Sequence, residues 1–496
     1  MYKLKEIVYD IIRNCRLIRN PSFFELRSEA SKYSAPNNLG VLAFTSKVRA
    51  RSVENTIDDI NSIPEERKEA VIKQLEEVRD WAKGRELIVV SGQVGNTSTF
   101  SIKATAYVSK SYPHLALMFM TNYFPAKEDG EGEIITIDIP EWKRNLIVVD
   151  PKEKINVVLG SDYYGELKMS ILRLAMNIAR ERGMLGVHAA SKLYRVKIGG
   201  EIREKGAIIF GLSGTGKTTI TMADHNLVKP EGVVIRQDDI NILTMDGKCL
   251  GTENNLYVKT DSLTKLPGLM KGVLHQDSII ENVSIKDGKV DFDDVSFSSN
   301  GRAIAIRNYI ENSDISINLD KVDLVFFITR RREMPVASKT KNEEQAVAYY
   351  MLGESVITSA GTMDANQVGK PIRVPGFDPF IIEPKWLNAI RLYEFLKRNK
   401  TEVYILNTGH VGDFKVTPEV TMRTVISIVK ERAEFEFDED LNLYVIKRAE
   451  GVNLSNLDPR RVFGENYKTI ARKLREERKQ YLKSNFPNLC FAYDEI

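Results

Sequence analysis

The sequence predicts a mixed α/β protein with two lobes, an N-terminal α+β lobe and a C-terminal nucleotide-binding lobe. Its 496 residues exceed what one hydrophobic core normally serves. Short β-branched runs alternate with helical patterns, and a glycine-rich loop directly follows the apolar run at 207–210. We therefore expect one lobe over residues 1–190 and a second over residues 191–496, with a lid and a C-terminal helical tail.

The first lobe begins with mostly helical patterns over about the first 85 residues. Pro64 opens a charged amphipathic stretch that runs to Trp81 and ends near Gly84. Apolar residues at helical spacing over 166–182 predict another helix, which Gly183 ends. Between these helices, β-branched or aromatic runs separated by Gly, Pro, Asn or Asp predict strands at 87–91, 99–108, 115–120, 134–139 and 146–149.

The second lobe has the alternation of apolar runs and polar loops that is typical of a nucleotide-binding α/β domain. Apolar runs predict strands at 207–210, 232–235, 283–285, 324–328 and 403–406. Several of these runs end at polar loops, where the ligands of α/β proteins normally bind.

The composition excludes several classes of partner. The net charge of +3 is small for a chain with 28% charged residues, so we expect no global attraction to nucleic acid or membrane. The basic run at 472–483 is interpreted as a solvated helix face rather than a polyanion-binding patch. No stretch approaches about 20 apolar residues, the start of the chain does not resemble a signal peptide, and the three cysteines lack CxxC spacing. A cytoplasmic protein with a small-molecule substrate is expected.

The glycine-rich loop carries the strongest functional signal. It matches GxxxxGK[ST] behind a buried strand, a pattern whose backbone NH groups cradle phosphates. Lys217 is expected to hold the β- and γ-phosphates of ATP, and the Thr218 hydroxyl to bind Mg²⁺. The nucleotide-binding residues predicted here are Gly211, Leu212, Ser213, Gly214, Thr215, Gly216, Lys217, Thr218 and Thr219.

Two further features could bind metal. Asp238 and Asp239 follow an apolar run behind the phosphate loop, as in a Walker B motif, although aspartates after a strand also form simple turns. His188 lies among small residues before the strand that leads to the loop. Taken alone, it is either a metal ligand or a core histidine with ordinary hydrogen bonds.

These residues occur in an order that resembles the ATP-dependent phosphoenolpyruvate carboxykinase family over about residues 160–430. The resemblance rests on several motifs in one order: Tyr163-Tyr164-Gly165-Glu166-Leu167-Lys168-Met169, His188, the loop 211–219, Glu281-Asn282-Val283, Asp291-Phe292-Asp293-Asp294, Arg302 and Asn407-Thr408-Gly409.

The resemblance implies a two-lobed carboxykinase that converts oxaloacetate and ATP to phosphoenolpyruvate, ADP and CO₂. It implies that His188 and Asp239 hold a second metal of the Mn²⁺ type, with Asp238 beside them. Arg302 would bridge the transferring phosphoryl group and the acceptor, since a guanidinium suits phosphate and carboxylate oxygens. Tyr163 would line the acceptor pocket of the first lobe. Three more positions fall where the family contacts nucleotide: Lys259, Lys415 and Thr421.

The chain departs from the family pattern at several places. Met169 stands where the family has a metal-binding lysine, and Lys168, one residue earlier, is kept as a candidate catalytic residue. A thioether is a poor partner for a hard cation. The N-terminal acceptor arginine is replaced, with 44–47 as the nearest segment and Lys47 at the arginine position. The run 330–332, three arginines, either recognises an anionic acceptor or forms a solvated loop, and the stretch 353–369 resembles the family's mobile lid.

Two other functions stay open at this point. A related kinase would use the same phosphate loop on a hydroxyl of another small molecule or of a protein, and Met169 would then mark the loss of a metal site. A non-catalytic ATP sensor would need neither Arg302 nor the pair His188 and Asp239.

Overall fold

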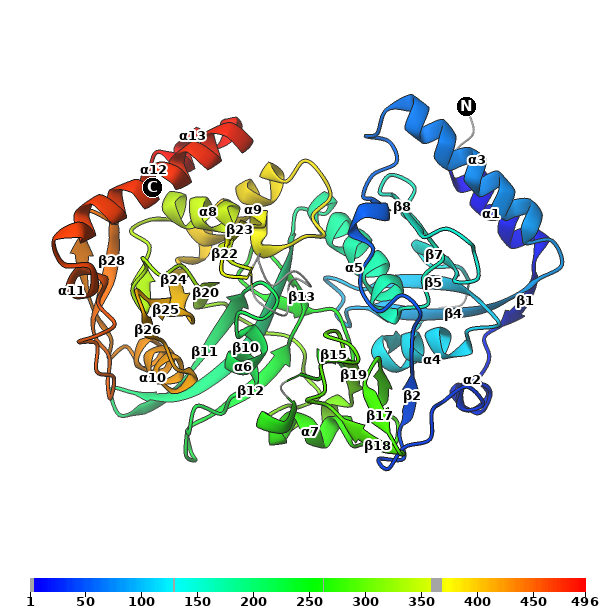
Figure 1. Ribbon diagram of the computed structural model, residues 1–496, viewed down its shortest axis with the longest axis horizontal. Coiled ribbons are helices and arrows are strands. Elements are labelled where there is room, and N and C mark those ends of the chain that lie inside the picture. The colour runs from blue at the N-terminus through cyan, green and yellow to red at the C-terminus, as the bar shows by residue number, and fades with distance from the viewer. Residues whose placement is uncertain (1–3, 128–129, 262, 358–367) are drawn as a thin grey trace. The chain divides into compact units, whose positions relative to one another are not determined.

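The structure is a computed structural model that describes residues 4–127, 130–261, 263–357 and 368–496 (Figure 1). The chain forms two compact units, Met1–Ala179 with Thr252–Glu311, and Arg180–Gly251 with Asn312–Ile496. The chain thus leaves the first unit, returns to it, and leaves it again. The division at residue 190 remains a prediction.

The first unit contains a large mixed sheet. In the described residues its order is β1-β4-β5-β7-β9-β8-β3, with β6 paired to β4. Helices α1 (Leu4–Asn14) and α3 (Glu65–Trp81) pack on each other and contribute apolar side chains to the core of this sheet. The strands are β1 (Arg16–Arg19), β3 (Thr56–Ile57), β4 (Glu86–Val94), β5 (Ile102–Ser109), β6 (Phe124–Pro125), β7 (Ile134–Ile139), β8 (Leu146–Asp150) and β9 (Ile155–Leu159).

A smaller sheet in the same unit joins the start of the chain to the returning segment. Its order is β15-β19-β16-β2, and a hairpin of β17 and β18 follows β16. Its strands are β2 (Leu42–Phe44), β15 (Leu256–Lys259), β16 (Ile279–Glu281), β17 (Ser284–Lys286), β18 (Lys289–Asp291) and β19 (Arg302–Ala305). The remaining helices of the unit are α2 (Phe23–Ser31), α4 (Pro113–Asn122), α5 (Tyr164–Glu181, which crosses the boundary) and α7 (Pro267–Val273).

One predicted strand of this unit is wrong, because residues 115–120 lie in helix α4. Pro113 occupies its first turn, where a proline has no hydrogen bond to lose. The segment shows no amphipathic period because the helix is buried on nearly every side. Helix α3, helix α5 and strands β4, β5, β7 and β8 confirm other predictions for this region. Strands β6 and β9 were missed, and the first 85 residues, expected to be mostly helical, also contain strands β1, β2 and β3.

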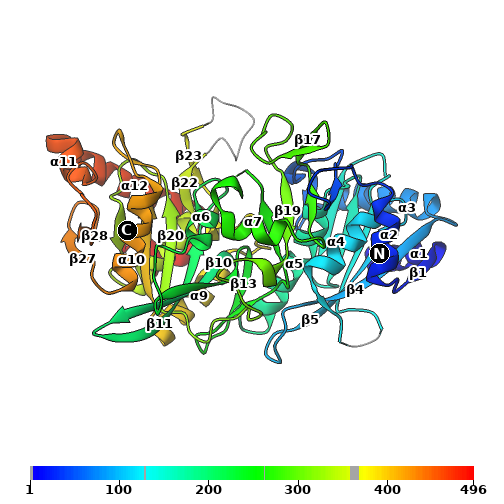
Figure 2. The same cartoon turned by 90° about the horizontal axis from the view of Figure 1, so that it is seen from below.

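The second unit is organised around a sheet in which β11, β20 and β24 run parallel. Its order is β14-β13-β10-β11-β20-β24-β21-β28-β27 in the described residues, with β12 also paired to β10. The antiparallel pair β10 and β11 extends beyond β20 (Figure 2). The strands are β10 (Leu185–Ile198), β11 (Glu201–Phe210), β12 (Gly232–Gln237), β13 (Ile240–Leu243), β14 (Cys249–Gly251), β20 (Leu324–Thr329), β21 (Ala337–Lys339), β24 (Glu402–Asn407), β27 (Glu434–Asp438) and β28 (Leu443–Arg448).

Helices and two hairpins complete this unit. Apolar residues of α8, α9 and α12 share one core with β10, β11 and β20, while α10 belongs to a core with residues of the same strands. The helices are α6 (Lys217–Met222), α8 (Glu343–Leu352), α9 (Trp386–Asn399), α10 (Pro418–Val429), α11 (Pro459–Phe463), α12 (Tyr467–Asn485) and α13 (Cys490–Tyr493). The hairpins are β22 (Glu354–Val356) with β23 (Pro371–Arg373), and β25 (His410–Val411) with β26 (Phe414–Lys415).

The basic run in α12 is not a uniformly solvated face. Arg478 is 1% exposed, and its guanidinium lies 2.7 Å from the Glu354 carboxylate at the base of the β22–β23 hairpin. Arg331 and Arg373 also pair with Glu354. Burial alone would raise the pKa of Glu354, but these guanidinium groups lower it to about 2. Helix α12 is therefore joined by an ion pair to the β22–β23 hairpin, whose strand β22 lies in the stretch 353–369 predicted as a lid. Residues 358–367 of this stretch lie outside the described part of the chain.

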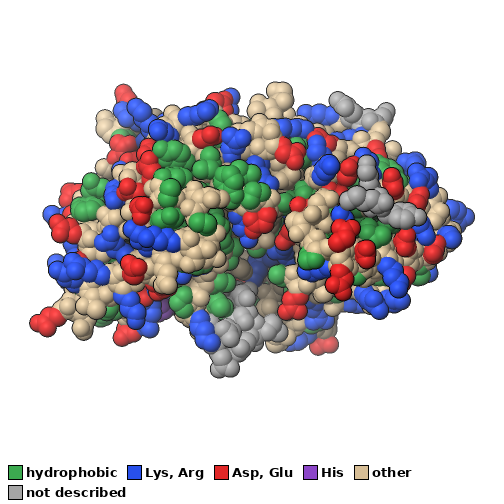
Figure 3. All heavy atoms as spheres, turned by 90° about the horizontal axis from the view of Figure 1, so that it is seen from above, with side chains coloured by type: hydrophobic (Ala, Val, Ile, Leu, Met, Phe, Trp, Pro, Cys, Tyr) green, Lys and Arg blue, Asp and Glu red, His purple; other side chains and the backbone are tan. Residues whose placement is uncertain are grey.

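The surface agrees with the nearly balanced charge of the sequence. On the face drawn in Figure 3, Lys and Arg side chains are interspersed with Asp and Glu side chains. Among the described residues, we find no helix with the length and apolar character needed to span a membrane.

Candidate active site

The phosphate loop follows β11 as the sequence predicts. Phe210 ends the strand in the core, and helix α6 begins at Lys217. Gly214 and Gly216 have φ values of 75° and 98°, which a residue with a Cβ adopts only with strain. The loop is braced from within, since the Thr215 hydroxyl donates to the Leu212 carbonyl at 2.7 Å. The two glycines therefore allow the turn that presents backbone NH groups ahead of Lys217.

Five of the predicted site residues converge in front of this loop. The Lys217 ammonium lies 3.4 Å from Nε2 of His188 and 3.8 Å from Oδ1 of Asp239, and His188 and Asp239 are 3.0 Å apart. The Thr218 hydroxyl lies 3.5 Å from Oδ2 of Asp238. The sheet explains this convergence, because β12 and β13 flank the aspartates and both pair with β10, which carries His188.

The orientation of His188 suits metal binding. Its Nδ1 lies 2.9 Å from the carbonyl oxygen of Phe377, which can only accept, so Nδ1 carries a hydrogen. In the neutral imidazole, Nε2 then presents a lone pair beside Oδ1 of Asp239, and both atoms face the Lys217 ammonium. A second metal would find one nitrogen and one carboxylate oxygen here. This donor set fits a Mn²⁺-type ion that also binds substrate and water oxygens.

The donor set of this site is incomplete on the protein side. In the part of the chain that the structure describes, no three His, Cys, Asp or Glu side chains are grouped so that they could hold a metal ion. Substrate oxygens and water would therefore fill the remaining positions, as is usual for metals that act on phosphates.

Lys168, the lysine next to Met169, is engaged inside the first unit. Its ammonium lies 3.2 Å from the Glu253 carboxylate, and both side chains are 1% exposed. The Asn122 amide also donates to Glu253, at 2.6 Å. Met169 follows on the same helix and is buried. Lys168 therefore has a carboxylate partner of its own.

Arg302 and Lys259 lie side by side on paired strands of the first unit. They are register partners in β19 and β15, and Arg302 also lies 5.5 Å from the centre of the Tyr257 ring. The Arg302 guanidinium donates to Asn300 at 3.1 Å. Burial, helped by the positive charge of Arg302, lowers the pKa of Lys259 to about 8. Two cations thus lie side by side: Arg302, which the sequence analysis assigns to the phosphoryl group, and Lys259, which it assigns to the nucleotide.

The Tyr257 ring is in turn positioned by a buried glutamate. The Tyr257 hydroxyl donates to Glu281 at 2.6 Å, and Glu281 also accepts from the Ser46 hydroxyl and the Tyr164 amide. Because burial outweighs these hydrogen bonds, the pKa of Glu281 is raised to about 7. Sequence reasoning noted Glu281 only as part of a motif, and its positioning contacts are visible only in the fold.

The segment that carries Tyr163 interacts with a further arginine, Arg51. Tyr163 is buried over Gly165, where an added Cβ would lie 2.3 Å from the tyrosine ring. The Glu166 carboxylate accepts a hydrogen bond from the Ser52 backbone NH at 2.9 Å. Burial raises the pKa of Glu166, and the positive charge of Arg51 partly offsets this rise. The sequence analysis considered Lys47 for the acceptor contact and did not consider Arg51. Lys47 is exposed, and its backbone NH donates a hydrogen bond to the Asp162 carboxylate. The Arg51-Ser52 pair, seven residues after β2, is the sequence signal that would draw attention to this segment.

The remaining predicted nucleotide contacts lie in the second unit. Lys415 is exposed at the end of the β25–β26 hairpin, opposite His410. Thr421 is buried in the first turns of α10, where its hydroxyl contacts the Thr417 carbonyl. The structure gives neither residue a direct contact with the phosphate loop among the interactions that it describes.

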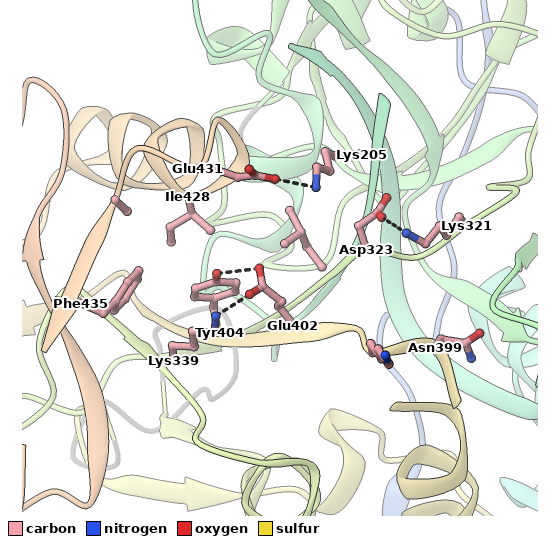
Figure 4. Close-up of a pocket in the computed structure, with 13 residues that line it drawn as sticks. Lys205, Lys321, Asp323, Lys339, Asn399, Glu402, Tyr404, Ile428, Glu431 and Phe435 are labelled. Atoms are coloured by element: carbon pink, nitrogen blue, oxygen red, sulfur yellow. Dashed lines mark hydrogen bonds and ion pairs between the residues drawn. The ribbon is translucent and has the colours of Figure 1, made fainter. Parts of the chain in front are cut away.

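A separate cavity of about 500 Å³ lies at the opposite end of the parallel strands (Figure 4). It contains four lysines, and three of them contact carboxylates: Lys205 with Glu431 at 2.8 Å, Lys321 with Asp323 at 2.6 Å, and Lys339 with Glu402. The Tyr404 hydroxyl donates to Glu402 at 3.0 Å. Most of the positive charge in this cavity is thus neutralised by the protein itself.

Comparison with known proteins agrees with the motif order. The model of the phosphoenolpyruvate carboxykinase family matches residues 45–455. A phosphoenolpyruvate carboxykinase (ATP) from Aeropyrum pernix is 42% identical over 99% of both chains. Enzymes of the same name from Fusobacterium nucleatum and Staphylococcus aureus are 24% and 25% identical, each over 82% of this chain and 80% and 79% of their own. This chain belongs to the ATP-dependent phosphoenolpyruvate carboxykinase family.

Proposed function

We propose that the protein converts oxaloacetate and ATP to phosphoenolpyruvate, ADP and CO₂. The observation that carries the proposal is the convergence of Lys217, His188 and Asp239 in front of the phosphate loop. A sensor that only binds ATP has no need of this group. The Aeropyrum pernix relative, which is named phosphoenolpyruvate carboxykinase (ATP) and matches 99% of this chain, supports a carboxykinase over a kinase with another acceptor.

The donor half of the reaction is assigned to the second unit. The loop 211–219 binds the triphosphate, Lys217 neutralises its outer phosphates, and Thr218 with Asp238 holds Mg²⁺. His188 and Asp239 hold the second metal, for which Mn²⁺ fits the nitrogen and carboxylate donors. When bound, the metals supply positive charge for the phosphoryl group and for the enolate oxygen. Lys415 and Thr421 are assigned to the nucleotide by the family resemblance.

The acceptor half is assigned to the first unit. Cleavage of the C–C bond releases CO₂ and leaves its electron pair in an enolate. The enolate oxygen then attacks the γ-phosphorus while the bond to the ADP oxygen breaks. Arg302, with Lys259 beside it, neutralises the moving phosphoryl group. Tyr163 and Arg51 contact the acceptor, because a guanidinium grips a carboxylate through two parallel hydrogen bonds.

The place of Lys168 follows from its partner. Its charge is held by Glu253, so we assign it to maintaining the buried cluster with Tyr257 rather than to binding metal. Because the Met169 thioether is a poor ligand for a hard cation, we assign the second metal to His188 and Asp239 alone. The division into an acceptor-side lobe and a phosphate-loop lobe, and the cytoplasmic location, belong to the same proposal.

The test is the production of phosphoenolpyruvate from oxaloacetate and ATP by the purified protein, with Mg²⁺ and Mn²⁺ together and separately. An acceptor-free reaction measures ATP hydrolysis alone. We expect phosphoenolpyruvate and ADP in equal amounts, with ADP release strongly dependent on oxaloacetate. Protein that binds ATP but forms no phosphoenolpyruvate would contradict the proposal.

A further inference from the structure

Three consecutive arginines follow β20, and the structure gives them different surroundings. Arg331 is 5% exposed and pairs with Glu333 at 3.0 Å and Glu477 at 3.4 Å. Arg332 donates to the Gly412 carbonyl at 2.6 Å and pairs with Asp413. Arg330 is half-buried, and within the described residues no carboxylate lies within ion-pair distance of it. Within the part of the chain that the structure describes, Arg330 alone of the three is therefore left without a counter-charge.

This imbalance is unfavourable unless an anion binds. A guanidinium partly withdrawn from water loses hydration, and an opposite charge normally compensates for that loss. Burial lowers the pKa of Arg330, whereas the carboxylates around Arg331 overcome its burial and raise its pKa. Among the described residues, the two neighbours thus show the difference between a guanidinium without a carboxylate partner and one that has several.

The position of Arg330 indicates which anion would bind. Strand β20 lies beside β11 in parallel register, so both end at the edge where the phosphate loop begins. Nε of Arg330 lies 3.5 Å from the Thr408 hydroxyl, and this hydroxyl donates to the Thr215 carbonyl of the loop at 2.6 Å. A single side chain therefore separates Arg330 from the phosphate loop.

The chain also leaves space for Arg330 at this point. A Cβ added to Gly409 would lie 3.0 Å from the Cβ of Arg330 and 3.2 Å from its Cα. A larger residue at 409 would therefore press on the backbone of Arg330. The Thr408 amide donates to the Thr329 carbonyl at 3.1 Å, which fixes the two loops to each other.

We propose that Arg330 is a further nucleotide-binding residue, which contacts the phosphate chain of ATP and ADP from the loop after β20. The planar guanidinium can donate two parallel hydrogen bonds to phosphate oxygens, a geometry that lysine does not reproduce. The proposal rests on the proposed function only for the identity of the nucleotide. It adds a cation to the set formed by the phosphate loop.

The test compares Arg330→Gln with the matched control Arg332→Gln, two substitutions of the same kind two residues apart. ADP binding is measured by titration calorimetry with Mg²⁺ and without acceptor. We expect Arg330→Gln to weaken ADP binding by about 10- to 100-fold, the value of one or two charge-assisted hydrogen bonds. Arg332→Gln should bind ADP within about twofold of the wild type, and Arg330→Lys should fall in between.

Two outcomes would overturn the assignment. One is wild-type affinity for ADP in Arg330→Gln, in protein whose thermal unfolding is unchanged. The other is unchanged ADP affinity with a raised KM for oxaloacetate, which would place Arg330 on the acceptor. If Arg330→Gln unfolds at a lower temperature, Arg330→Lys keeps the test decisive, because it retains the charge and loses only the fork. Calorimetry needs no turnover, so failure of the proposed reaction would leave this test intact.

Discussion

The two ends of strands β11, β20 and β24 treat positive charge in opposite ways. At the amino ends, the lysines 205, 321 and 339 each contact a carboxylate beside the cavity of Figure 4. At the carboxyl ends, the Lys217 ammonium lies 3.8 Å from Asp239, a carboxylate that also contacts a histidine. In the described residues, Arg330 has no carboxylate within ion-pair distance. The difference teaches that positive charge which the protein balances only in part, as at Lys217 and Arg330, marks the phosphate site, while three of the four lysines at the other end are closely matched and serve structure.

The same contrast recurs in the first unit. Lys168 is buried with Glu253, whereas Lys259 lies beside Arg302 and its pKa is lowered to about 8. Both lysines are withdrawn from water, so burial alone does not distinguish them. Their neighbours distinguish them. The carboxylate beside Lys168 indicates a structural lysine, and the guanidinium beside Lys259 indicates a lysine suited to bind phosphate.

The largest effect is expected at Lys217. Lys217→Met removes the charge that faces the outer phosphates, and we expect kcat/KM for ATP to fall roughly a thousandfold. The measurement is steady-state formation of phosphoenolpyruvate. A fall of less than about tenfold, in protein with unchanged thermal stability, would break the comparison at its most important residue.

Asp239 comes next, because it provides half of the protein donors for the second metal. Asp239→Asn keeps the shape of the side chain and removes its charge, so Mn²⁺ affinity should fall by about 10- to 100-fold. Electron paramagnetic resonance of free Mn²⁺ measures that affinity directly. Asp413→Asn, an exposed carboxylate on another loop, is the control and should bind Mn²⁺ as the wild type does.

The pH dependence tests the role of Lys259. Since its pKa is about 8, the lysine is charged below that pH and loses its charge as the pH rises through it. We expect kcat/KM for ATP to fall across this range, by up to about tenfold. In Lys259→Arg the fall should move to higher pH. An identical pH profile in both proteins would show that Lys259 does not contact the nucleotide.

Glu281 extends the comparison to carboxylates. Glu354 is matched by guanidinium groups and has its pKa lowered to about 2, while Glu281 accepts hydrogen bonds from neutral groups and has its pKa raised to about 7. Because the native state holds the Glu281 proton more tightly than the unfolded chain does, its contribution to stability is complete below about pH 4.5 and is lost as the pH rises through 7.

Glu281→Gln should remove this dependence. We expect the free energy of unfolding of the variant to change by up to about 3 kcal/mol less than that of the wild type between these pH values. Urea unfolding at several pH values measures it, with Glu311→Gln as an exposed control. Parallel pH profiles for wild type and Glu281→Gln would show that Glu281 titrates normally.

The smallest effect is expected at the amino ends of the strands. Lys339→Met removes a surface ion pair with Glu402, which is worth about 1 kcal/mol or less. Turnover should stay within about twofold of the wild type. A large loss of ATP affinity in this variant would show that matched lysines also bind phosphate, and the contrast between the two edges would fail.

The sequence was most informative where function depends on local backbone geometry. The phosphate loop was predictable because its glycines, Lys217 and Thr218 are adjacent in sequence and follow a buried strand. The grouping of His188 with Asp239 came from the family resemblance, because a lone histidine and two aspartates have no spacing that brings them together. Their contact depends on the pairing of β12 and β13 with β10.

Other features could not be predicted because they depend on tertiary partners. Three identical arginines at 330–332 differ only in what the fold places beside them, and no local pattern indicates that Arg331 is buried. The run at 115–120 has no period because α4 is buried on nearly every side. The return of residues 252–311 to the first unit is likewise set by strand pairing with β2.

The most direct test of the central claim is the affinity for ADP at both edges of the same sheet. Calorimetry on the wild type, Lys217→Met, Arg330→Gln and Lys339→Met compares two residues of the carboxyl edge with one of the amino edge. We predict weaker binding in the first two variants and wild-type affinity in the third. Equal affinities in all four proteins, or a loss confined to Lys339→Met, would contradict the claim that incompletely balanced positive charge marks the phosphate site.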